Sequence, residues 1–188
     1  MTKNSKHRQS QRYNTGAIIL HWIMALAFFL MLASGIVMTY IDIGQSLKFQ
    51  MYQWHKSLGV LLLLALGLRI IWRFISTAPA LPDHFSALEK IAGHAGHLAL
   101  YVFMILMPLS GWVMVSSSVY GLPTIVFDMF EWPHIPDIQG NEVIETRSRN
   151  AHFVFAVLFS IIIFTHIAAV IKHMLYDNEN LLNRMWWR

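Results

Sequence analysis

Residues 151–174 read AHFVFAVLFSIIIFTHIAAVIKHM. This stretch is apolar and exceeds the ~20 helical residues that the hydrocarbon core of a bilayer requires. Near its two ends lie His152 and His166, with His173 seven residues after the second, and an ionisable side chain inside a membrane usually marks function because it is costly to place there. At about 100° and 1.5 Å per residue, a spacing of 14 returns His166 to within about 40° of His152, about 21 Å further along the helix. Two such side chains at two depths on one helix face indicate two cofactor sites, one near each membrane face.

Three further segments have the same character, so we predict an all-α membrane protein, a four-transmembrane-helix bundle forming one domain over residues 1–188. The predicted spans are approximately 17–40, 57–75, 97–116 and 151–174, with an outer loop at approximately 117–150. The composition agrees, because 56% hydrophobic and 13% charged residues, with a mean hydropathy of +0.48, are too apolar for a soluble domain. The first span is too long an apolar segment for a cleaved signal peptide.

The distribution of basic residues predicts the orientation. Ten of the fourteen Lys and Arg fall in the two terminal regions and the second connection: Lys3, Lys6, Arg8, Arg12, Arg69, Arg73, Lys90, Lys172, Arg184 and Arg188. The opposite side has four basic and six acidic residues. Since cytoplasmic loops carry the excess of Lys and Arg, both termini are expected in the cytoplasm. The basic balance indicates contact with membrane lipid, and no motif suggests nucleic acid.

The chain has no cysteine, which excludes iron–sulfur clusters, covalently attached c-type haem, thiolate zinc sites and disulfides. The predicted spans also contain no carboxylate, so a proton relay of the usual pump type is unsupported. Imidazole is the strongest ligand type that remains, and paired imidazoles are typical of haem b.

The 14-residue spacing recurs in the other predicted spans. It places His55, His152, Gly35 and Gly111 at an outer level, and His21, His166, His97 and Arg69 at an inner level. Glycines leave room for a planar macrocycle, although they also allow close helix packing. Arg69 and Arg73 can bind haem propionates, although arginines near a helix end also extend to lipid phosphates. His7, His84, His94 and His134 lie in or near tails and connections, where solvation is expected.

Several motifs together resemble the bacterial cytochrome b561 family. They are GAIILHW at 16–22, WHKSLG at 54–59, RIIWR at 69–73, GHLALY at 96–101, Ala151-His152, the later His166 and His173, and DNENLLNRM at 177–185. The resemblance covers nearly the whole chain except the first dozen residues and much of 120–145.

This resemblance implies a multi-pass cytochrome of the bacterial inner membrane that holds two b haems. By position, His21 and His166 are expected to ligate the cytoplasmic-side haem iron, and His55 and His152 the periplasmic-side one. The implied function is electron transfer between the quinone pool and a periplasmic redox partner. The family also includes a superoxide oxidase that passes electrons to ubiquinone, so an oxidoreductase activity is the alternative. A membrane-anchor subunit of a larger oxidoreductase is the third reading, disfavoured because the short C-terminal tail offers no evident docking extension.

Two features bear on these alternatives. Superoxide should be attracted by positive charge, and Lys56, Arg147 and Arg149 lie near the outer ligands, within a side that is net acidic. His97 and His173 are expected at the inner level, where a histidine can donate to a quinone carbonyl and carry a proton. The competing interpretation is that His97 orients a propionate and His173 is an interfacial residue.

Overall fold

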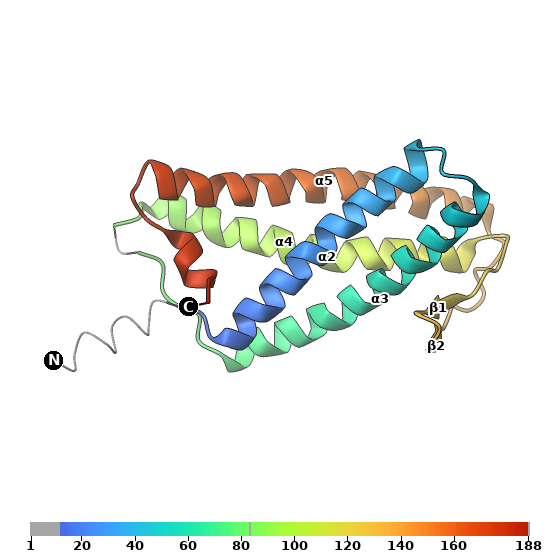
Figure 1. Cartoon of the computed structure of the whole chain (residues 1–188), viewed down its shortest axis with the longest axis horizontal. Helices are drawn as coiled ribbons and strands as arrows, with labels where there is room; N and C mark the ends of the chain where they lie inside the picture. Colours follow the sequence, from blue (N-terminus) through green and yellow to red (C-terminus); the bar gives the residue numbers. More distant parts are fainter. Residues whose placement is uncertain (1–11, 83, 188) are drawn as a thin grey trace.

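The computed structural model describes residues 12–82 and 84–187. Within them lie four helices long and apolar enough to span a membrane: α2 (Thr15–Tyr40), α3 (Gln45–Ile75), α4 (Ala87–Ser117) and α5 (Glu142–Leu175). Helix α2 packs mainly against α3, and α4 against α5, with further contacts between α3 and α4 (Figure 1). The predicted four-helix membrane fold is confirmed. Lys3, Lys6, His7, Arg8 and Arg188 lie outside the described residues.

Three of the helices begin well before the predicted spans. Helix α4 begins after Ser86, whose hydroxyl accepts from the Glu89 amide while the Glu89 carboxylate accepts from the Ser86 amide, which is a capping box. Helix α5 begins after Asn141, whose side chain accepts from the Ile144 amide. Hydropathy locates only the apolar part of such a helix, because a polar extension outside the membrane is fixed by its caps instead.

The predicted outer loop contains a short hairpin, β1 (Thr124–Val126) paired antiparallel with β2 (Phe130–Trp132), followed by the start of α5. Its turn places Phe127 and Asp128 at φ of 44° and 58°, which is typical of tight hairpin turns. We call this end of the bundle, at the right of Figure 1, the loop end.

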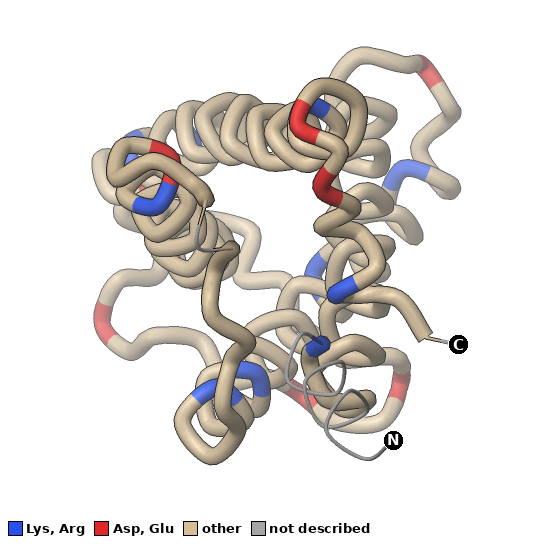
Figure 2. Tube along the Cα trace, turned by 90° about the vertical axis from the view of Figure 1, so that its left-hand side faces the viewer, with Lys and Arg blue, Asp and Glu red and all other residues tan. Residues whose placement is uncertain are grey.

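The opposite end, the termini end, holds the start of α2 and the 3₁₀ helix η1 (Leu181–Met185) (Figure 1). The Tyr13 amide donates to the Arg184 carbonyl at 3.1 Å, and the Trp22 indole to the Met185 carbonyl at 2.6 Å. Viewed from this end, most of each helix is free of charged residues, which lie mainly at helix ends and connections (Figure 2). This distribution suits a chain whose helix middles contact lipid.

The core lies halfway along the bundle. It consists of Met24, Ala27, Leu62, Leu66, Met104 and Phe159. Phe159 is 2% exposed and contacts the rings of Phe28 and Phe103. Each helix contributes to this core between its two predicted site levels, so the core separates the two ends.

Candidate functional site

At the loop end, His55 of α3 faces His152 of α5. Their ring centroids are 6.4 Å apart and the ring planes cross at 71°. The two residues predicted at the outer level therefore lie opposite each other, although they come from helices that are far apart in the sequence. Both side chains are half-buried.

A serine from the preceding helix holds each of these histidines. The Ser34 Oγ of α2 lies 2.8 Å from His55 Nδ1, and the Ser110 Oγ of α4 lies 2.9 Å from His152 Nδ1. Neither serine was predicted. The sequence did contain a signal, because the dipeptide Ser-Gly follows both His21 and His97 at the same interval.

The predicted glycines adjoin the same rings. A Cβ added at Gly111 would lie 3.3 Å from Cε1 of His152, and one at Gly35 would lie 3.8 Å from Cε1 of His55. The first distance is tighter than ordinary van der Waals contact, so Gly111 provides space that an alanine would take from His152. The loop-end cluster therefore comprises Ser34, Gly35, His55, Ser110, Gly111 and His152.

At the termini end, the residues predicted at the inner level form a second cluster, His21, Arg69, His97 and His166. The ring centroids of His97 and His166 are 5.5 Å apart with their planes at 56°. Arg69 Nη2 lies 3.0 Å from Nδ1 of His21, and His21 is near enough to His97 and His166 that protonated rings there would repel its own. His97 is exposed, whereas His21 and His166 are half-buried.

The model of the prokaryotic cytochrome b561 family matches residues 12–188. The chain belongs to this family. It is also 29% identical to cytochrome b561 homolog 2 of Escherichia coli (strain K12) over 175 residues, 93% of this chain and 91% of that protein. The family consists of membrane cytochromes that bind haem b and transfer electrons, so the resemblance inferred from the motifs is confirmed.

The loop-end cluster fits a haem iron. Metal–imidazole bonds of about 2 Å, with each ring centre about 1 Å behind its nitrogen, place the centroids of two axial imidazoles about 6 Å apart. The 6.4 Å between His55 and His152 agrees with this spacing. Because Gly35 and Gly111 carry no side chain, the two rings can lie close against α2 and α4.

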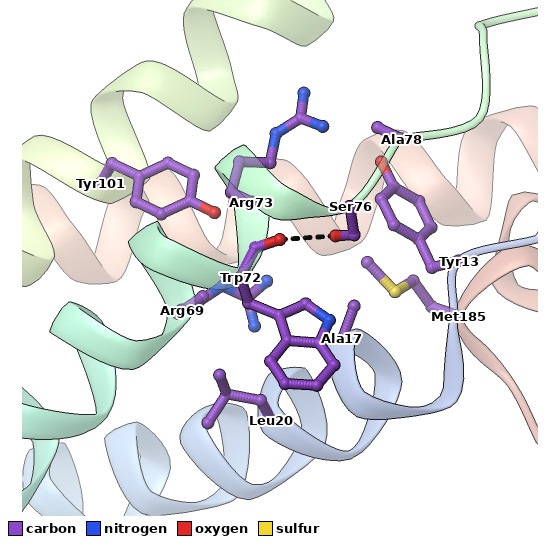
Figure 3. Close-up of a pocket in the computed structure, with 10 residues that line it drawn as sticks. All are labelled: Tyr13, Ala17, Leu20, Arg69, Trp72, Arg73, Ser76, Ala78, Tyr101 and Met185. Atoms are coloured by element: carbon purple, nitrogen blue, oxygen red, sulfur yellow. Dashed lines mark hydrogen bonds between the residues drawn. The ribbon is translucent and has the colours of Figure 1, made fainter.

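The predicted propionate partners of this cytochrome b561 line one pocket at the termini end (Figure 3). Arg69 and Arg73 lie one turn apart on α3. The pocket lining also includes three aromatic residues, Tyr13 before α2, Trp72 of α3 and Tyr101 of α4, and Met185 of η1. Two guanidinium groups beside aromatic rings suit an anionic or polar group carried by a planar molecule.

His173 lies near the C-terminal end of α5, where its contacts are with Asp177 and Phe85. Its Nδ1 lies 2.5 Å from the Asp177 carboxylate, and its ring stacks on Phe85 at 4.5 Å. Glu89, His173 and Asp177 are close enough to bind a metal ion, but the Lys172 ammonium lies 2.9 Å from Glu89 and 2.7 Å from Asp177. A cation of the chain itself therefore bridges these carboxylates.

The remaining histidines divide into two kinds. His84 lies 3.6 Å from Glu179, and His94 Nδ1 lies 2.6 Å from the Lys90 carbonyl, both at the surface. The Nε2 atom of His134, expected to be solvated, is instead buried, with no hydrogen-bond partner among the described residues. The expectation for His134 was wrong because the hairpin segment folds onto the bundle: the Trp112 indole donates to the Pro133 carbonyl, and the Ile135 amide to Ser116.

Proposed function

We propose that this cytochrome holds two b haems and transfers electrons between membrane quinone and a redox partner outside the membrane. The observation that carries the proposal is the presence of a histidine cluster at each end of the same four helices. Helix α5 contributes His152 to one cluster and His166 to the other, about 21 Å apart along the helix axis. Haem b supplies one-electron oxidation and reduction.

At the loop end, His55 and His152 would hold the iron of a haem b. They approach a common centre from α3 and α5, and both rings are oriented by hydrogen bonds at Nδ1. Ligating histidines generally have such a partner on the second ring nitrogen.

At the termini end, His21 and His166 are the proposed ligands, with Arg69 and Arg73 as propionate partners. The guanidinium of Arg69 already contacts His21, so it lies where the edge of a macrocycle bound there would need a cation. His97, which faces His166, is the competing ligand at this end.

Between the clusters, the packed core excludes water. Phe159 lies seven residues from both His152 and His166, and it contacts the rings of Phe28 and Phe103. Electron transfer through this region needs no moving group, and the apolar packing fixes the separation of the two ends.

We further propose that the termini end faces the cytoplasm and the loop end the periplasm of a bacterial inner membrane. The excess of Lys and Arg in the terminal regions and the second connection supports this orientation. The water-borne partner would then meet the loop-end haem beside the hairpin, which is attached to α3 through Lys56 and Ser57.

Quinone would exchange electrons at the termini end. Of the two histidines proposed to bind it, His97 has the stronger support because it lies inside the cluster, beside His166. The Nδ1 of His173 is occupied by Asp177, which leaves His173 only Nε2 for a ligand.

Superoxide is the second candidate for the loop-end partner. The basic residues that favour it are partly engaged, since Lys56 donates to the Pro123 carbonyl at 2.9 Å and Arg149 forms an ion pair with Glu145. The Lys56 contact fixes the position of its ammonium, and the Arg149 ion pair weakens the local positive field that would attract an anion, so we favour a different water-borne partner.

A reduced-minus-oxidised spectrum of the purified protein, with the ratio of haem to protein, tests the proposal. Two b haems per chain are expected, and a ratio of one would contradict it. Reoxidation by a ubiquinone analogue then tests the acceptor, and reduction by superoxide tests the alternative. A protein that copurifies in equal amount would indicate an anchor subunit instead.

A further inference from the structure

The hydroxyls of Ser34 and Ser110 have a defined hydrogen-bond direction. Each hydroxyl has one proton, and each donates it within its own helix: Ser34 to the Met31 carbonyl at 2.9 Å, and Ser110 to the Met107 carbonyl at 2.8 Å. Each oxygen can therefore only accept from the histidine that it contacts. It follows that Nδ1 of His55 and of His152 carries the ring proton.

This direction determines which ring nitrogen can bind a metal. A neutral imidazole has one N–H and one lone pair, so a proton on Nδ1 leaves the lone pair on Nε2. The same arrangement occurs twice, once between α2 and α3 and once between α4 and α5. Both histidines are thus set in the tautomer that coordinates through Nε2.

The two contacts also fix the rotation of the rings. Each Nδ1 is held at hydrogen-bond distance by a serine on a different helix, and the glycine after that serine adjoins the ring. With both rings held in this way, their planes cross at 71°.

We propose that Ser34 and Ser110 are positioning residues that hold His55 and His152 as Nε2 ligands in crossed planes and so set the redox potential of the loop-end haem. The inference depends on the proposed role of the two histidines as ligands.

Two physical consequences follow. An acceptor on Nδ1–H makes the imidazole a stronger electron donor, which stabilises ferric over ferrous iron and lowers the midpoint potential. When the two imidazole planes are crossed, the two iron d orbitals that interact with their π systems have nearly equal energy. Low-spin ferric iron then gives an electron paramagnetic resonance signal with a highly anisotropic g-tensor. Loss of a serine should therefore raise the potential and make this signal less anisotropic.

Threonine and valine provide a matched pair of substitutions, because they have nearly the same shape and only threonine keeps the hydroxyl. Ser34→Thr and Ser110→Thr are compared with Ser34→Val and Ser110→Val in the full-length, haem-containing protein. Ser160→Ala is the control, since the Ser160 hydroxyl donates to the Ala156 carbonyl of its own helix. His55→Ala identifies which potential and which resonance belong to the loop-end haem.

We expect each valine variant to shift the loop-end potential upward and to reduce the anisotropy of its resonance. The termini-end haem, the threonine variants and the control should match the parent. Where a valine variant loses the loop-end haem while its threonine counterpart retains it at the parental potential, the hydroxyl is again shown to be required.

Parental potentials and resonances in both valine variants would overturn the proposal, leaving the hydroxyls as helix-internal hydrogen bonds only. That result differs from a failure of the proposed function, in which His55→Ala would retain two low-spin haems.

Discussion

The two histidine clusters differ in what each offers to Nδ1 of a proposed ligand. At the loop end, Nδ1 of each histidine lies beside a serine hydroxyl, of Ser34 or Ser110, which we infer to be the acceptor. At the termini end, Arg69 lies 3.0 Å from Nδ1 of His21, and a guanidinium can only donate. Nδ1 of a neutral His21 then carries the lone pair, and Nε2 carries the proton. As proposed ligands, His55 and His152 would have the lone pair on Nε2, whereas His21 would have it there only if an acceptor replaced Arg69 at Nδ1.

This difference shows how one helical pattern can give two kinds of site. Helices α2 and α4 each place a histidine toward the termini end and a Ser-Gly pair toward the loop end. The loop end is covered by a hairpin bound to α3 and α4, and the termini end by η1 and the residues before α2. Arg69 of α3 lies at the termini end. Its guanidinium would hold an anionic group there, such as a propionate.

The largest expected effect concerns which end faces which compartment. A reporter fused after Arg188 should be active only in the cytoplasm, and one inserted at Gln139 only in the periplasm, because the basic residues are concentrated in the terminal regions and the second connection. Activity of the C-terminal fusion in the periplasm would reverse the assignment of both clusters.

Removal of one ligand should eliminate one haem. His55→Ala or His152→Ala should abolish the loop-end haem, and His21→Ala or His166→Ala the termini-end haem, each leaving about half of the b-type absorbance. His84→Ala is the control, since His84 lies at the surface beside Glu179. Two low-spin haems in His166→Ala would remove that residue from the ligand set.

The four spans and the meeting of His55 with His152 could be predicted because helical periodicity fixes both depth and direction. For the serines, the repeated Ser-Gly interval after His21 and His97 gives only the depth. Their hydrogen bonds depend on how each helix is rotated about its axis, which the interval does not fix. For His173, helical periodicity gives the direction of the side chain but not its contacts. Periodicity directs it toward the side of His166, but Asp177, four residues later, and Phe85, before α4, hold it instead. The burial of His134 Nε2 likewise depends on a hairpin segment that hydropathy does not detect.

His97 provides a sharper test of the termini end. Its ring is 5.5 Å from that of His166, so either His97 or His21 can be placed opposite His166. We expect His97→Ala to keep both haem spectra and to slow reoxidation by a ubiquinone analogue, whereas His21→Ala loses a haem. Loss of a haem in His97→Ala, with two retained in His21→Ala, would make His97 the ligand.

Arg69→Gln should weaken binding of the termini-end haem. A charge-assisted hydrogen bond contributes about 1.5–3 kcal/mol, so the expected loss is about 10- to 100-fold in haem affinity at this end, measured by haem transfer to an acceptor protein. The matched variant Arg73→Gln removes a more exposed guanidinium of the same pocket and should have a smaller effect. Equal retention of both haems in Arg69→Gln would leave the propionate assignment without support.

The smallest expected effect lies at the termini end, where Asp177 joins α5 to the segment that follows it. The hydrogen bond from Lys172, reinforced by His173, holds the pKa of the Asp177 carboxyl below its usual value. A carboxyl with a lowered pKa in the folded state stabilises the protein above its unfolded pKa of about 4, and this contribution is lost as the pH falls through the folded value. Asp177→Asn should therefore lower the melting temperature in detergent at neutral pH, with the difference from the parent shrinking in acid.

In a Lys172→Met background, the Asp177→Asn substitution should have less effect on the melting temperature, because the main hydrogen-bond donor to Asp177 is gone. A difference that stays constant with pH would mean that the Asp177 charge does not hold this segment, and the termini end would then be closed chiefly by the contacts of Trp22 and Tyr13 with η1.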